Sequence, residues 1–183
     1  MNATSKPTVF LLGPSGSGKT RLSEWLDEDL RFLRIEIDCW PEGDGIDLAG
    51  LRKEWDAFLG SGNVRSLAAA IGTKVRAANR QGAVLSFPST FVLPTALAEA
   101  AEAEGVRIVI LYGTGAHCLA AFLRRELELG RGLDADHWIA NNAQTYAQIS
   151  RPEYAKYRLN AFTKTNHRRR VVLVADMKRR IIG

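Results

Sequence analysis

Short apolar runs alternate with amphipathic stretches along most of the sequence. Apolar runs of about 4–8 residues are typical of strands buried on both faces. In the stretches between them, apolar residues recur every three or four positions, as on the buried side of a helix. The predicted strands are 9–12, 32–38, 83–87, 106–112 and 170–175.

Helical periodicity fills the intervals between these strands. Leu22, Leu26 and Leu30 share one face of the first interval, and Pro94 and Gly105 mark the start and end of another helix. Because strands alternate with helices, we predict a three-layer α/β fold with about five parallel strands and helices on both faces. No linker divides residues 1–183, so a single domain is expected. The predicted helices cover 21–30, 47–58, 64–80, 94–104, 116–129, 141–149 and 152–162.

The first strand runs directly into a glycine-rich octet that precedes a predicted helix. The octet reads Gly13-Pro14-Ser15-Gly16-Ser17-Gly18-Lys19-Thr20 and matches G-x-x-x-x-G-K-[ST] at every fixed position. Its glycines let successive N–H groups converge on a phosphate at the helix N-terminus. Lys19 supplies a cation for the β- and γ-phosphates, and the Thr20 hydroxyl can ligate Mg²⁺. The octet predicts a P-loop NTPase fold that binds a nucleoside triphosphate, with ATP and Mg²⁺ as the expected cofactors.

Composition and charge narrow the function classes. The 183 residues are 46% apolar and 25% charged, which is ordinary for a globular domain. No apolar stretch is long enough to span a membrane, and the N-terminus lacks the order of a secretion signal. Two cysteines without metal-ligand spacing favour a cytoplasmic setting. The net charge of +5 reflects late basic runs, 167–170 and 178–180. These runs indicate either a solvated face with arginines that handle phosphates or a nucleic-acid contact, and the lack of interleaved aromatic residues disfavours the nucleic-acid contact.

Two acidic residues, Glu36 and Asp38, close the second predicted strand. Ligands of open α/β sheets bind at the carboxyl ends of the strands. Asp38 could orient an acceptor hydroxyl and take its proton as the γ-phosphoryl group moves. Glu36 points to the same side of the strand and could hold a Mg²⁺-bound water. The alternatives are an Asx turn for Asp38 and a solvent-facing edge position for Glu36.

Arginines gather after the fourth predicted strand. The stretch around 124–150 is a predicted lid, because glycines flank Arg131 on both sides. Arg124 is a candidate for the nucleotide phosphates, and Arg131 for closing over the γ-phosphate. Arg151 is a candidate for contacting the substrate. Ordinary surface charge is an equally good interpretation of each of these arginines.

With these residues in place, the sequence resembles the small-molecule P-loop kinases of the shikimate and gluconate kinase group over nearly its full length. An Asp-x-Asp pair of shikimate kinases matches Glu36-Ile37-Asp38, which implies that Glu36 assists Mg²⁺ and Asp38 contacts the substrate hydroxyl. The lid arginine of that family, which touches ATP and substrate, has its nearest match in Arg131. The family arginine that binds the substrate carboxylate is similar to Arg151, which precedes Pro152-Glu153-Tyr154.

The departures from this family lie in the acceptor half of the site. Pro88-Ser89-Thr90 replaces the family's Gly-Gly-Gly, Glu36 replaces an Asp, and a further substrate-binding arginine has only Arg65 nearby. We therefore expect an ATP- and Mg²⁺-dependent kinase that moves the γ-phosphate to a hydroxyl of a small molecule other than shikimate. The open alternatives are a regulatory module that binds ATP and hydrolyses it slowly or not at all, and a kinase of nucleotides or nucleic-acid 5′ ends.

Overall fold

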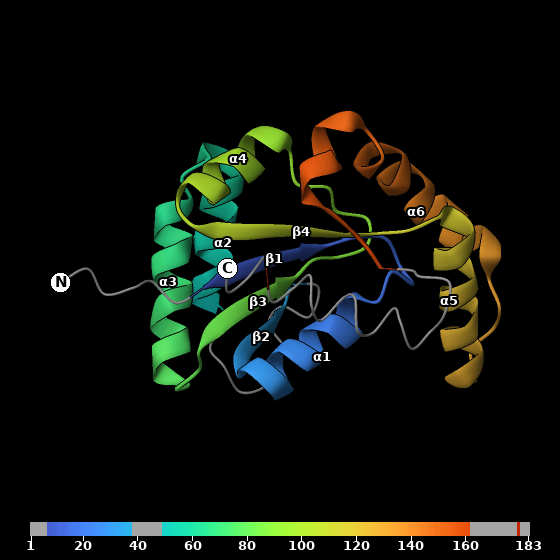
Figure 1. The fold of residues 1–183 in the computed structure, drawn as a ribbon, viewed down its shortest axis with the longest axis horizontal. Coiled ribbons are helices and arrows are strands. Elements are labelled where there is room, and N and C mark those ends of the chain that lie inside the picture. Colours follow the sequence, from blue (N-terminus) through green and yellow to red (C-terminus); the bar gives the residue numbers. More distant parts are fainter. Residues whose placement is uncertain (1–6, 38–48, 162–178, 180–183) are drawn as a thin grey trace. The chain divides into compact units, whose positions relative to one another are not determined.

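The computed structural model describes residues 7–37, 49–161 and 179. Its strands form one five-stranded sheet in the order β2-β3-β1-β4-β5 (Figure 1). The β2–β3 and β4–β5 pairings are parallel. Together with the surrounding helices this is the predicted three-layer α/β fold. The strands are β1 (Thr8–Leu12), β2 (Phe32–Glu36), β3 (Gly82–Ser86), β4 (Val106–Tyr112) and β5 (Arg158–Asn160).

Several helices begin next to a side chain that caps them. Asn63 accepts a hydrogen bond from the Arg65 N–H at 3.1 Å, and Thr114 accepts one from the His117 N–H at 3.2 Å. The α-helices are α1 (Lys19–Leu30), α2 (Ala49–Ser61), α3 (Val64–Ala77), α4 (Thr95–Ala103), α5 (Gly115–Glu128) and α6 (Ala135–Ile149), and η2 (Pro152–Tyr157) is a 3-10 helix. No helix in the described ranges has the length and apolar character to span a membrane.

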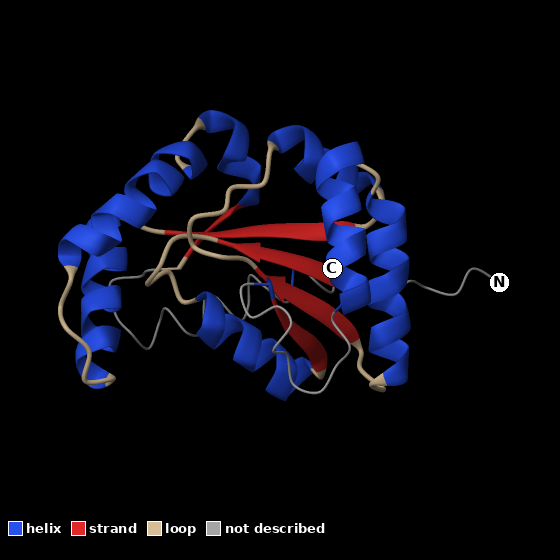
Figure 2. Cartoon of the chain, turned by 180° about the vertical axis from the view of Figure 1, so that it is seen from behind, coloured by secondary structure: helices blue, strands red, loops and turns tan. Residues whose placement is uncertain are grey.

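The chain divides into two compact units. The first comprises residues 1–10, 20–87 and 93–108, apart from those not described. Within it, helices α2 and α3 lie side by side (Figure 2), and α3 packs on β3. An aromatic cluster fills its interior, where the Phe10 ring lies 5.3 Å from Phe87 and 6.2 Å from Trp55 between ring centroids. Aromatic side chains of this size each bury a large apolar area, so the cluster is a central part of the core of the first unit.

The second unit comprises residues 11–19, 88–92 and 109–183, again apart from those not described. Helices α5 and α6 pack together around Cys118, Phe122 and Trp138, all of which are buried. The Tyr112 and Tyr146 rings stack with their centroids 5.6 Å apart. The loop between β1 and α1 belongs to this unit, so α5 and α6 provide its structural surroundings.

Of two predicted elements near the C-terminus, one is corrected by the structure and the other lies outside the described residues. The predicted helix 152–162 is wrong: η2 covers Pro152–Tyr157, and Arg158–Asn160 then forms β5. Residues 158–160 pair with Ile110–Tyr112 of β4, and this pairing overrides a helix-like composition. The predicted strand 170–175 lies outside the described residues. Helix α6 begins at Ala135, six residues before its predicted start, because the Asp134 side chain caps it by accepting from the His137 N–H at 2.7 Å.

Candidate functional site

The octet 13–20 has the backbone that its sequence predicts. Strand β1 ends at Leu12 and helix α1 begins at Lys19, so the glycine-rich segment is a loop between a strand and a helix N-terminus. Gly13, Gly16 and Gly18 have φ angles of 141°, 79° and 93°, which side-chain-bearing residues rarely adopt. The Ser17 N–H donates to the Pro14 carbonyl at 3.2 Å and closes the turn. A loop with these φ angles at the start of a helix fits the anion-binding nest that the sequence predicts.

Gly16 also has a packing role. A Cβ atom at Gly16 would lie 2.1 Å from the Cys118 carbonyl oxygen and 2.9 Å from the Phe122 nitrogen. The loop therefore rests directly on the main chain of α5, with no room for a side chain. Ordinary van der Waals contact needs about 3.5–4.0 Å between such atoms.

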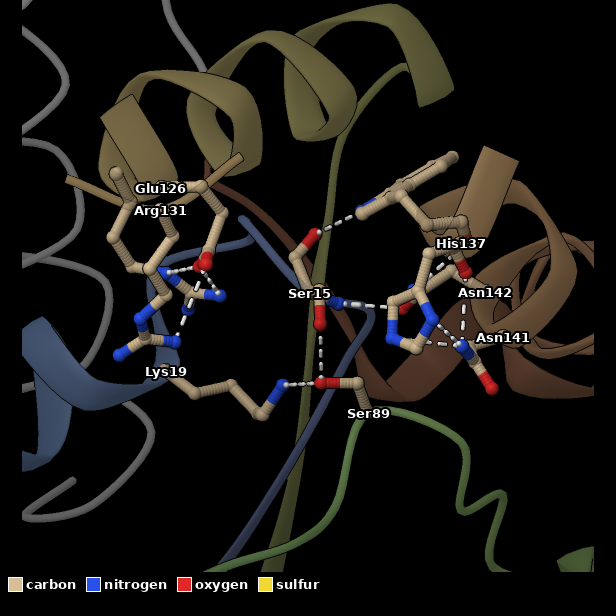
Figure 3. Close-up of polar contacts among 10 residues, drawn as sticks. Ser15, Lys19, Ser89, Glu126, Arg131, His137, Asn141 and Asn142 are labelled. Atoms are coloured by element: carbon tan, nitrogen blue, oxygen red, sulfur yellow. Dashed lines mark hydrogen bonds and ion pairs between the residues drawn. The ribbon is translucent and has the colours of Figure 1, made fainter. Parts of the chain in front are cut away.

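The Lys19 ammonium group lies over the loop. Nζ donates to the Gly13 carbonyl at 2.6 Å and to the Pro14 carbonyl at 3.3 Å. It also donates to Ser89 Oγ at 3.4 Å (Figure 3). Ser89 stands in the segment 88–90 that departs from the shikimate kinase pattern. Its hydroxyl thus lies beside the predicted phosphate-binding cation, which the sequence alone did not indicate.

Ser15 is held by three side chains from outside the loop. Its N–H donates to Asn142 Oδ1 at 2.8 Å, and its carbonyl accepts from Trp138 Nε1 at 3.1 Å. Its hydroxyl donates to Ser89 Oγ at 2.8 Å. Sequence analysis missed Asn142 and Trp138, because they are more than a hundred positions away from Ser15 and belong to no recognisable motif.

The predicted magnesium ligands Thr20 and Glu36 lie near a common serine in the first unit. Ser23 Oγ donates to the Thr20 carbonyl at 2.8 Å and lies 3.5 Å from Glu36 Oε1. Thr20 is exposed, and Glu36 accepts from Arg34 Nε at 2.7 Å. A hydroxyl and a carboxylate are hard oxygen ligands, so these two residues fit Mg²⁺. The structure thus brings Thr20 and Glu36 into one neighbourhood, whereas Asp38 lies outside the described residues.

The predicted arginines differ in their surroundings. Glu126, whose side chain is only 9% exposed, pairs with Arg131 at 3.2 Å and with Arg125 at 2.9 Å. Figure 3 shows the contact of Glu126 with Arg131 near the end of α5. Arg124 is exposed, and Arg151 lies 4.0 Å from Glu153 at the surface. A charged contact that the sequence did not predict therefore ties Arg131, in the segment after α5, back to Glu126 of that helix.

Comparison with solved structures identifies the fold. A gluconokinase from Sinorhizobium meliloti 1021 matches with a TM-score of 0.51 and 17% identity, over 96% of this chain and 94% of that one. TT1252 from Thermus thermophilus also has a TM-score of 0.51, at 13% identity over 98% and 100% of the two chains. The chain has the fold of a P-loop kinase.

Other comparisons add less. A shikimate kinase from Bacteroides thetaiotaomicron matches with a TM-score of 0.49 and 16% identity, over 94% of this chain and 96% of that one. No family model matches the sequence, and no curated protein does. At 17% identity, the similarity to the gluconokinase shows a shared fold and nothing about activity. Activity must therefore be argued from the residues of the site.

Proposed function

We propose that this protein is an ATP- and Mg²⁺-dependent phosphotransferase that moves the γ-phosphate of ATP to a hydroxyl of a small molecule. The observation that carries the proposal is the complete P-loop, with three glycines at positive φ and the Lys19 ammonium group over the loop carbonyls. The P-loop kinase fold supports the same reading. Phosphoryl transfer depends mainly on positioning and charge stabilisation, and these are the features that such a loop provides.

On this proposal the loop N–H groups bind the triphosphate and Lys19 exchanges its carbonyl partners for phosphate oxygens. Thr20 and Glu36 would hold Mg²⁺, Thr20 directly and Glu36 through a water. Bound Mg²⁺ supplies charge that stabilises the β- and γ-phosphate oxygens. Arg131 would leave Glu126 to contact the γ-phosphate, and Arg124 would contact the nucleotide phosphates.

The acceptor half of the proposal rests on Asp38 and Arg151. Asp38 would orient the acceptor hydroxyl and take its proton, and Arg151 would bind an anionic group of the acceptor. Ser89 adds a hydroxyl beside Lys19, in a segment where shikimate kinases have glycine. This substitution favours an acceptor other than shikimate.

The test is ADP release from Mg²⁺-ATP, measured alone and with a panel of hydroxyl-bearing acceptors that includes gluconate and shikimate. One acceptor should raise ADP release well above the basal rate. Lys19→Ala should lower that rate by about 100-fold or more, because it removes charge stabilisation of the transferred group. Lys53→Ala, which changes an exposed lysine of α2, is the matched control and should have no effect. ATP binding without stimulation by any acceptor would instead favour a regulatory ATP-binding module.

A further inference from the structure

Ser15 is the point at which α6 contacts the P-loop. Asn142 and Trp138 lie one helical turn apart on α6 and bind the two main-chain polar groups of this single residue. We infer that Asn142 and Trp138 are positioning residues that fix the first half of the P-loop for phosphate binding. The effect on phosphate binding rests on the proposed function, whereas the contacts of Asn142 and Trp138 with Ser15 can be tested without nucleotide.

The contacts of Asn142 are directional. Its Nδ2 donates to the Trp138 carbonyl at 3.0 Å, which leaves Oδ1 to face the Ser15 N–H at 2.8 Å. Asn142 is 2% exposed, and a buried amide is costly unless both of its ends are hydrogen-bonded. An asparagine is also a poor helix former, so an apolar residue would suit α6 better if packing alone mattered. The hydrogen bond to Ser15 accounts for a polar residue at this position.

Trp138 holds the other side of Ser15. Trp138 is 6% exposed and packs with Cys118 and Phe122, while its Nε1 donates to the Ser15 carbonyl. The neighbouring Gly16 lies against the main chain of the same two α5 residues. The first half of the loop is thus confined by α5 and α6. A loop that is already ordered loses less entropy when it binds a ligand.

Amide hydrogen exchange in the nucleotide-free protein tests the contact itself. Asn142→Ala should speed exchange of the Ser15 N–H by about tenfold or more, because that group loses its buried acceptor. Asn141→Ala is the matched control, since Asn141 is exposed on the same helix and its side chain hydrogen-bonds to His137 rather than to Ser15. The control should leave Ser15 exchange unchanged. Unchanged exchange in Asn142→Ala would overturn the inference.

Nucleotide affinity tests the consequence. Asn142→Ala should raise the Kd for Mg²⁺-ATP by about fivefold or more, and Asn141→Ala by less than about twofold. Trp138→Phe keeps an aromatic ring but removes the Nε1 donor, so it should also weaken binding and serves if Asn142→Ala does not fold. Faster Ser15 exchange with an unchanged Kd would show a merely structural contact and overturn the inference. If the wild-type protein itself fails to bind ATP, the proposed function and the positioning role both fail, while hydrogen exchange still reports on the contact.

Discussion

Gly16 and Gly130 adopt similar backbone conformations in different surroundings. Their φ angles are 79° and 67°, but a Cβ at Gly16 would meet the α5 main chain at 2.1 Å, whereas Gly130 has open space within 4 Å. Gly130→Ala should cost only the backbone strain, about 1–2 kcal/mol. Gly16→Ala adds a clash that main-chain atoms cannot relieve, so its loss of stability should be clearly larger. Urea unfolding of both variants gives the comparison, and equal losses would contradict the packing role of Gly16.

Individual residues of the loop differ in how far the local sequence predicts their conformation and their contacts. The P-loop prediction follows from glycine spacing within eight consecutive residues, and Gly13, Gly16 and Gly18 have positive φ angles in the structure. The partners of Ser15 come from residues 89, 138 and 142. Asn142 carries no local sign of its role, because its polar character becomes informative only once its 2% exposure is known. Motifs therefore predict loops, while long-range packing decides which side chains support them.

At the scale of elements, the Tyr112–Tyr146 stack joins α6 to the end of β4. The Tyr146 hydroxyl donates to the Gly113 carbonyl, and the Tyr112 hydroxyl lies 3.4 Å from Ser150 Oγ. Burial raises the pKa of Tyr146 from 10.0 to about 12, with Tyr112 adding to the rise. The hydrogen bond with Ser150 is the main cause that lowers the pKa of Tyr112. As the pH rises through the alkaline range, titration of Tyr146 therefore lowers the free energy of unfolding, whereas titration of Tyr112 raises it.

The raised pKa of Tyr146 predicts a loss of stability in alkali. Between pH 10 and about 12 the unfolded chain has lost this proton while the folded chain keeps it, so the free energy of unfolding falls as pH rises. Denaturant unfolding of Tyr112→Phe and of Tyr112→Phe/Tyr146→Phe isolates the effect, because the opposing tyrosine is absent from both. The free energy of unfolding of Tyr112→Phe should fall relative to that of the double variant as the pH rises from 10 to about 12. A constant difference would show that Tyr146 titrates normally in the folded protein.

Sequence periodicity predicts some strands of this sheet and not others. Residues 106–112 were predicted from their apolar run and form β4 with the same limits. Residues 158–160 were predicted as the end of a helix, yet they form β5. Three residues are too short to show a strand period, and their state depends on the exposed hydrogen-bonding edge that β4 offers. Local periodicity is therefore sufficient for the long buried strand and insufficient for the short one.

For the whole molecule, the strand order places β1 third of five, and β1 leads into the P-loop. A nucleotide bound there contacts the folded protein but not the unfolded chain. At about 100 times its Kd, such a ligand stabilises the folded state by about 2.7 kcal/mol. For a domain of this length the melting temperature should then rise by roughly 5–10 °C. Thermal unfolding with Mg²⁺-ATP measures this rise directly.

Two comparisons test whether the thermal shift comes from ATP and Mg²⁺ bound at the P-loop. Lys19→Ala should lose most of the thermal shift, because the cation that meets the β- and γ-phosphates is gone, whereas Lys53→Ala should keep all of it. ATP with a chelator should produce a smaller shift than Mg²⁺-ATP if Thr20 and Glu36 hold the metal. Glu36→Gln should narrow that difference, since it replaces the carboxylate by a neutral amide. An equal shift in the wild-type protein and Lys19→Ala would place ATP away from the P-loop and contradict the proposed site.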